Sequence, residues 1–121
     1  MRDWIITGAF FAALGILIGA FGAHGLKTKI SSENLIVFEI GVRYQIYHAV
    51  GLILLGMIGF HFPNELINIS GYLFCSGIIL FSGSLYLLAV TNLRWLGAIT
   101  PIGGFCFIFG WLILAFKIYR S

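Results

Sequence analysis

The stretch EIGVRYQIYHAVGLILLGMIGF, from Glu39 to Phe60, carries several polar side chains directly into an apolar run. Its first ten residues include Glu39, Arg43, Gln45 and His48, and every residue after His48 is apolar. About 20 apolar residues in a helix span the roughly 30 Å hydrocarbon core of a bilayer. The stretch therefore predicts a transmembrane helix with polar chemistry at one end only.

The composition of the whole chain is that of a membrane protein. Of its 121 residues, 60% are hydrophobic and 9% are charged, whereas soluble domains carry roughly a quarter charged residues. The length predicts a single domain over residues 1–121. Seven Lys and Arg against four Asp and Glu form no basic run or stripe, so we expect no nucleic-acid partner.

Long apolar segments on either side of this stretch complete a set of four spans. The predicted spans cover about residues 4–26, 36–61, 66–90 and 97–119. A helix satisfies its own backbone hydrogen bonds in lipid, which favours helices in these segments. The sequence therefore predicts an all-α membrane protein, a bundle of four transmembrane helices with short loops and both termini on the same side.

Small residues indicate where the predicted helices approach one another. Three glycines of the first span recur at spacings of three or four residues, and such a stripe lets helix backbones come close in lipid. In the last span, Thr100 as a cap and Pro101 at the first helical position predict a helix start; the alternative is a kink one turn inside the helix. The residues expected to serve helix packing are Gly15, Gly19, Gly22, Pro101 and Gly104.

The polar side chains converge on one side of the membrane. Because alternate spans run in opposite directions, the ends of the first and third spans lie level with the starts of the second and fourth. The second loop carries only ordinary loop residues. The convergent set, a candidate ligand or ion site, comprises His24, Glu39, Arg43, Tyr44, Gln45, His48, Ser82, Ser84, Tyr86 and Thr100.

Glu39 and Arg43 lie four residues apart on one face of the predicted helix. Ionisable groups near the membrane usually pair with each other, and a spacing of four residues suits an ion pair. We therefore expect an ion pair between them rather than a catalytic role.

The basic residues are almost evenly divided between the two sides, so the sequence does not determine the orientation in the membrane.

His48 lies about 10 Å below the polar boundary, if the span leaves the hydrocarbon near His61. One interpretation is a neutral histidine bonded to Ser82, Ser84 or Tyr86 as a lock between helices. The other is a group that handles protons or ions together with Gln45.

A metal site built from His24, His48 and Glu39 has suitable ligand types but no compact ligand spacing. We therefore expect no metal and no cofactor.

Four motifs resemble those of one known family, in the same order. They are GAFGAHGLK (residues 19–27), YQIYHAVG (44–51), FSGSLY (81–86) and GAITPIGGFCFIFGW (97–111). The family is an uncharacterised bacterial membrane-protein family, domain of unknown function number 423, whose animal relatives are called transmembrane protein 256. The resemblance covers nearly the whole chain. The matching positions are Gly22, His24, Gly25, Tyr44, Gln45, His48, Ser84, Tyr86, Thr100, Pro101 and Gly104.

The resemblance implies a small four-span protein of the bacterial cell (inner) membrane and no established activity. The first hypothesis is a non-enzymatic protein, structural or partner-binding, which assembles with itself or with an unknown membrane partner. The alternative is an oligomeric transporter or channel for a small solute or ion that uses the buried His48 and Gln45. An enzyme is not expected, because the sequence has no nucleophile–base pair and no paired carboxylates.

Overall fold

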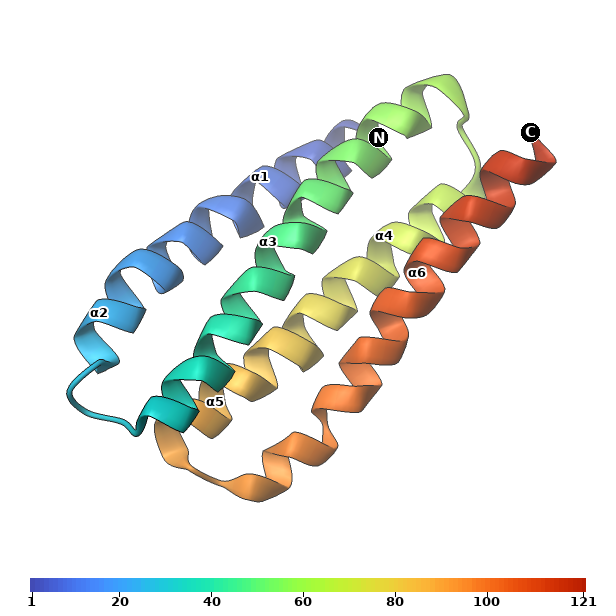
Figure 1. The fold of residues 1–121 in the computed structure, drawn as a ribbon. Coiled ribbons are helices and arrows are strands. Elements are labelled where there is room, and N and C mark those ends of the chain that lie inside the picture. The colour runs from blue at the N-terminus through green and yellow to red at the C-terminus, as the bar shows by residue number, and fades with distance from the viewer.

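The computed structural model describes residues 1–121, and its four membrane-length helices lie side by side (Figure 1). The N- and C-termini lie at the same end of the bundle. The four-helix fold and the common side of the termini agree with the prediction. The four spans are Arg2–Leu26, Ser32–His61, Glu65–Thr91 and Arg94–Arg120.

Three of the spans are built from several elements. The first contains α1 (Arg2–Leu17), a π-helical turn (Ile18–Gly22) and α2 (Ala23–Leu26), and the second is α3 (Ser32–His61). The third contains α4 (Glu65–Gly77), a π-helical turn (Ile78–Ser82) and α5 (Gly83–Thr91). A 3₁₀ segment (Arg94–Ala98) precedes α6 (Thr100–Arg120).

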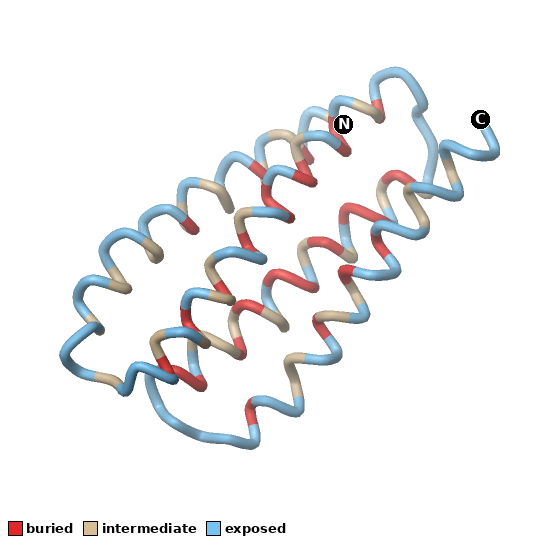
Figure 2. Tube along the Cα trace, viewed as in Figure 1, coloured by how far each residue is buried: buried red, intermediate tan, exposed pale blue.

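The second and third spans form the centre of the bundle. α1 packs along α3, while α4 and α5 pack against α3 from the other side and α6 packs against α4. Buried residues therefore concentrate on α3, α4 and α5, whereas α1 and α6 are largely exposed (Figure 2). The exposed side chains of these outer helices are mainly apolar, as lipid contact requires. The buried apolar core consists of Trp4, Leu52, Leu55, Ile67, Phe74, Ile78 and Phe107.

The glycine stripe of the first span lies against α3. An added Cβ would meet the Ile46 side chain at Gly15, the Val42 side chain at Gly19 (2.8 Å) and the Phe38 ring at Gly22. Side chains of α3 thus occupy the space that the three glycines leave.

The start of α6 differs from the prediction in two respects. Thr100 is the first residue of the helix rather than its cap, because the residue at the N-cap position is Ile99 and no side chain caps the helix. The close approach is made by Gly103, where an added Cβ would overlap the backbone of Phe81. At Gly104 the nearest Phe81 atom would lie at an ordinary 3.8 Å.

Candidate functional site

Gln45 connects three of the four spans at the polar end of the bundle. Its side chain is 2% exposed. The Nε2 group donates to the carbonyl oxygen of Phe11 in α1 at 2.9 Å, and Oε1 accepts from the Tyr86 hydroxyl of α5 at 2.6 Å. A buried amide in lipid needs partners for both its ends, and here α1 and α5 supply them.

His48 is buried one turn further along α3, and both of its ring nitrogens have partners. Nδ1 lies 2.8 Å from the Tyr44 carbonyl oxygen, which can only accept, so Nδ1 carries the proton. Nε2 accepts from the indole N–H of Trp111 at 2.9 Å. The imidazole also stacks on the Phe107 ring, with the centroids 3.6 Å apart. This arrangement is a neutral histidine that joins α3 to α6.

The partners of His48 differ from those expected. Neither Ser82, Ser84 nor Tyr86 bonds to the imidazole; Trp111, which the sequence analysis did not single out, does. An indole N–H inside an apolar span needs an acceptor, and the polar side chains at the same depth could have indicated this pairing.

The serines and Thr100 form further connections between helices. Ser82 Oγ donates to the Gly41 carbonyl oxygen of α3 at 2.6 Å. Ser84 Oγ and Thr100 Oγ1 lie 2.6 Å apart, linking α5 to α6. Ser70 Oγ of α4 donates to the Gly110 carbonyl oxygen of α6 at 2.9 Å, a connection that the sequence analysis missed.

Asn34 is a further residue that the sequence analysis missed, because the predicted spans leave it in the first loop. It lies in the first turn of α3 and is 5% exposed. Its Nδ2 donates to the Ala89 carbonyl oxygen (3.3 Å) and to Asn92 Oδ1 (3.1 Å), while its Oδ1 accepts from Arg94 (3.3 Å). The first turn of α3 is thus joined to the end of α5 and to the third loop.

The buried polar residues and their side-chain partners form what we call the inner network: Asn34, Gln45, His48, Ser70, Ser82 and Ser84, with Tyr86, Thr100 and Trp111. Every buried side-chain nitrogen and oxygen atom has a hydrogen-bond partner. His24 lies apart from the network, since it is exposed on α2 and bonds to none of its members. No three His, Cys, Asp or Glu side chains gather into a group that could hold a metal ion.

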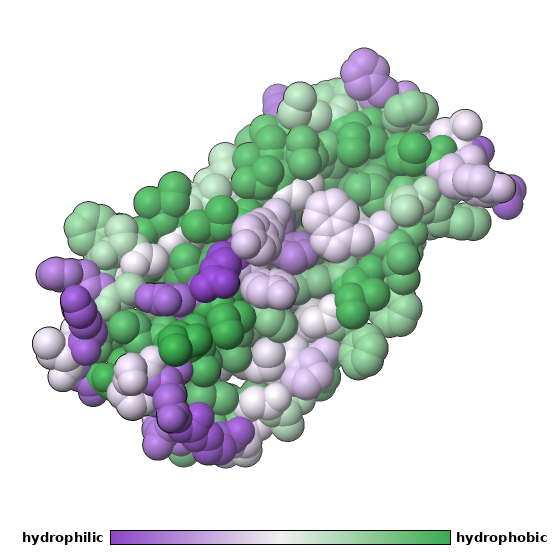
Figure 3. Space-filling model, viewed as in Figure 1, coloured by the Kyte–Doolittle hydropathy of each residue, from purple (hydrophilic) through white to green (hydrophobic).

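The remaining members of the predicted cluster, Glu39, Arg43 and Tyr44, are exposed on α3. Tyr47, which the prediction did not include, is exposed beside them, and we call these four residues the outer polar face. On the space-filling surface, purple and white atoms cross an otherwise green region at the middle of the molecule (Figure 3). Polar side chains thus interrupt a surface that otherwise suits lipid.

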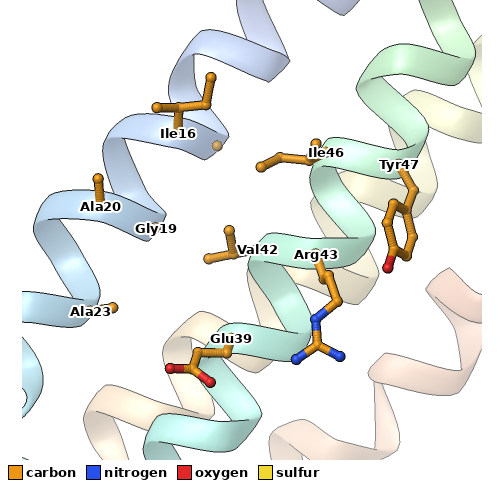
Figure 4. A pocket seen from close by; sticks show the side chains of 10 residues that line it. Ile16, Gly19, Ala20, Ala23, Glu39, Val42, Arg43, Ile46 and Tyr47 are labelled. Atoms are coloured by element: carbon orange, nitrogen blue, oxygen red, sulfur yellow. The ribbon is translucent and has the colours of Figure 1, made fainter.

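The predicted ion pair between Glu39 and Arg43 is absent from the structure. The Glu39 carboxylate turns toward the first span, while Arg43 turns to the other side of α3 with Tyr47 (Figure 4). Each charge is therefore left without an opposite charge within the chain. The two side chains leave successive turns of one helix in different directions, which the spacing of four residues does not reveal.

An open groove of about 500 Å³ runs between the first span and α3, beside the outer polar face. Val42 and Ile46 of α3 point into it toward the first span (Figure 4). The small residues of the first span make its other wall. The lining residues are Gly15, Ile16, Gly19, Ala20, Ala23, Glu39, Val42, Arg43, Ile46 and Tyr47.

The depth of the outer polar face follows from the length of α3. At 1.5 Å per residue, a core of about 30 Å takes about 20 residues, and this count back from Phe60 ends near Gly41. Glu39 then lies at the headgroup level and Arg43 just inside the hydrocarbon. Tyr47 lies roughly 9 Å inside it.

Comparison with known proteins gives a family and membrane-protein relatives. The family model described as "Protein of unknown function (DUF423)" matches residues 18–104. The "UPF0382 membrane protein SH2409" of Staphylococcus haemolyticus is 48% identical over 120 residues, which cover 99% of this chain and 98% of that protein. The "UPF0382 membrane protein YwdK" of Bacillus subtilis is 45% identical over 115 residues, 94% of each chain. No solved structure matches the chain.

Proposed function

The chain belongs to the family of membrane proteins described as "Protein of unknown function (DUF423)", and we propose that it is a non-enzymatic, self-associating protein of the bacterial cell (inner) membrane. In this proposal the outer polar face is the docking surface, and the inner network holds the bundle that presents it. The observation that carries the proposal is the outward direction of Arg43 and Tyr47, at membrane depth and without a polar partner in the protomer.

The need for a partner follows from the chemistry of these groups in lipid. A charged or hydroxyl group in hydrocarbon is costly unless it is paired or reaches water. Arg43 can extend toward the headgroups, but Tyr47 is 54% exposed one turn deeper and its hydroxyl makes no hydrogen bond within the protomer. A second transmembrane surface would supply partners for both side chains.

Charge complementarity favours a second copy of this chain as the partner. With a two-fold axis along the membrane normal, the same face meets itself and each contact occurs twice. Glu39 of each protomer can then pair with Arg43 of the other, which gives two equivalent ion pairs. Their offset of four residues, about 6 Å along the helix, is within the combined reach of the two side chains.

The inner network supports a structural role for the remaining polar residues. Both ring nitrogens of His48 and both ends of the Gln45 amide are already bonded within the bundle. Polar bonds between helices in membranes often hold the helices in register. Hydrogen bonding between the spans therefore explains these residues, and no bound substrate is needed to explain them.

A charge-swap experiment tests the docking surface. We expect the protein in lipid nanodiscs or mild detergent to give a dimer by native mass spectrometry. Glu39→Arg and Arg43→Glu should each weaken the dimer, because they place like charges opposite each other across the interface. The double variant restores opposite charges and should restore the dimer.

The matched control is Glu65→Arg, which makes the same charge change at an exposed position at the opposite end of the bundle. It should leave the dimer unchanged. A wild-type protein that is monomeric across a range of lipid-to-protein ratios contradicts the proposal. A dimer that is indifferent to both single swaps contradicts this choice of surface.

The second candidate is an oligomeric transporter or channel, and the observation that favours it is the open groove beside Glu39 and Arg43. Between two protomers, this groove would present opposite charges to a small solute or ion. The test is flux through proteoliposomes for the wild type and for Glu39→Gln. Flux that the variant loses while it keeps the dimer would support transport, whereas a dimer without flux would support the first role alone.

A further inference from the structure

A second pocket lies between the first and third loops, away from the outer polar face. Its volume is about 430 Å³. It lies where α3 begins and α5 ends, at the polar end of the bundle. The lining residues are Lys29, Ile30, Ser31, Asn34, Ala89, Val90, Asn92 and Arg94.

The charge of this pocket is entirely positive. Lys29 comes from the first loop and Arg94 from the start of the 3₁₀ segment, and no Asp or Glu lines the pocket. The two residues are far apart in sequence and converge only in the folded bundle. A pocket with two cations and no carboxylate selects an anion.

The uncharged polar groups of the pocket add further donors. Ser31 Oγ accepts from the backbone N–H of Asn34 at 3.1 Å, which leaves its own hydroxyl hydrogen free to donate. Asn92 Oδ1 accepts from Asn34, and its Nδ2 group makes no hydrogen bond in the protomer. Several N–H and O–H donors around one space match the several acceptor oxygens of a phosphate group.

The position of Arg94 is fixed by a buried residue. One guanidinium nitrogen donates to Asn34 Oδ1 at 3.3 Å, and Asn34 is in turn held by the Ala89 carbonyl oxygen and by Asn92. The guanidinium is therefore anchored at one edge, and its other N–H groups remain available. An anchored Arg loses less conformational freedom when it binds an anion.

We propose that this pocket binds a phosphate group, carried either by the headgroup of an anionic phospholipid or by a soluble phosphate. The loop level of the pocket coincides with the headgroup region of the bilayer, and basic pockets between transmembrane helices suit anionic headgroups. The N-terminus of α3, a helix of 30 residues whose N-cap is Ser31, adds a positive partial charge to the same space. This binding role is separate from the self-association proposed above, because it uses none of the residues of the outer polar face.

Two arms of one experiment separate the two sources of phosphate. In the first arm, native mass spectrometry compares the retention of phosphatidic acid with that of phosphatidylcholine by the purified full-length protein. In the second arm, inorganic phosphate is titrated by calorimetry into the protein in phosphatidylcholine nanodiscs. The variants are Lys29→Glu and Lys29→Gln, with Lys27→Glu as matched control, since Lys27 lies in the same loop but does not line the pocket.

We expect the wild type and Lys27→Glu to bind alike and Lys29→Glu to bind roughly tenfold more weakly, the loss typical of one charge-assisted hydrogen bond. Preferential retention of phosphatidic acid that is lost in Lys29→Glu assigns the pocket to a lipid headgroup. Binding in the calorimetric arm alone assigns it to a soluble phosphate.

The proposal is overturned if neither arm detects binding, or if Lys27→Glu weakens binding as much as Lys29→Glu does. The latter outcome would indicate diffuse surface charge. Thermal unfolding checks that each variant is folded, and Lys29→Gln replaces Lys29→Glu in both arms if the reversed charge prevents folding. Because dimer formation is measured separately, a failure of this proposal leaves the docking surface untouched.

Discussion

The indole N–H of Trp111 donates to Nε2 of His48 at 2.9 Å, and this bond ties the last helix of the bundle to the second. The opposite nitrogen of the same imidazole bonds to the Tyr44 carbonyl oxygen. The tautomer of His48 is thereby fixed, and the ring lies flat against Phe107. The most conspicuous histidine of the sequence is a link between helices.

Removal of the Trp111 donor should destabilise the bundle. Trp111→Phe keeps an aromatic ring but leaves His48 Nε2 without its partner, and hydrogen bonds between membrane helices contribute about 1 kcal/mol. We expect a loss of that size in the free energy of unfolding, measured by denaturation in mixed micelles. Trp95→Phe, at an exposed position, is the control and should have little effect; equal effects of the two variants would contradict the role of the bond.

The Gln45–Tyr86 bond predicts coupling between two substitutions. Gln45→Leu and Tyr86→Phe each remove the same 2.6 Å hydrogen bond, so their effects on stability should not add. A double-mutant cycle should give a coupling free energy of about 1 kcal/mol. Gln45→Leu alone should cost more than Tyr86→Phe, because it also removes the bond to Phe11. Strict additivity would show that the pair does not interact.

Two adjacent glycines of α6 should respond in opposite ways to the same substitution. Gly103→Ala places a Cβ on the backbone of Phe81, and overpacking of this kind costs about 1–3 kcal/mol. Gly104→Ala meets only ordinary contacts and removes a glycine from a helix, so it should be neutral or slightly stabilising. Thermal unfolding of both variants measures the difference, and a more harmful Gly104→Ala would contradict this packing.

Asn92 should be sensitive to backbone conformation as well as to its hydrogen bond. It is the only non-glycine residue with a positive φ, 59°. Asn92→Ala loses the Asn34 partner and strains an L residue in the left-handed region, which costs about 1–2 kcal/mol. Asn92→Gly loses the same partner without the strain. The alanine variant should therefore unfold at the lower temperature, and the reverse order would contradict this reasoning.

The two histidines of the family motifs should differ sharply on substitution. His24 is exposed on α2, so His24→Ala should change stability by no more than about 0.5 kcal/mol. His48→Ala removes two hydrogen bonds and an aromatic stack, and we expect a loss of roughly 2–3 kcal/mol. The same unfolding assay measures both variants. Similar losses of stability would contradict the expectation that the exposed His24 contributes little to stability.

The sequence by itself determined the class of fold. Apolar runs of sufficient length leave a chain in lipid little choice but helices, since only helices satisfy the backbone of each span internally. The spacing of Gly15, Gly19 and Gly22 also placed one face of the first span against a neighbour, because helical periodicity alone puts them on one side.

The tertiary structure alone decided which polar groups are partners. The sequence predicted that Glu39, Arg43, Gln45 and His48 lie at a similar depth in the membrane. Depth alone does not say how the helix is rotated about its axis or where each side chain points. The rotation of α3 and the rotamers of its side chains turned Gln45 and His48 inward to Tyr86 and Trp111 and left both charges outside and apart. For this reason the expected ion pair was wrong.

Asn34 and Lys29 show that contacts between loops could not be predicted from the sequence either. Residues outside the predicted spans have no periodicity from which to predict a neighbour, so no pattern in the sequence joined the first loop to Arg94. The antiparallel packing of α3 against α5 brings these segments together and builds the basic pocket. Composition and periodicity decide that a chain like this one crosses the membrane four times, whereas side-chain pairing depends on helix rotation and contact, which exist only once the helices have packed.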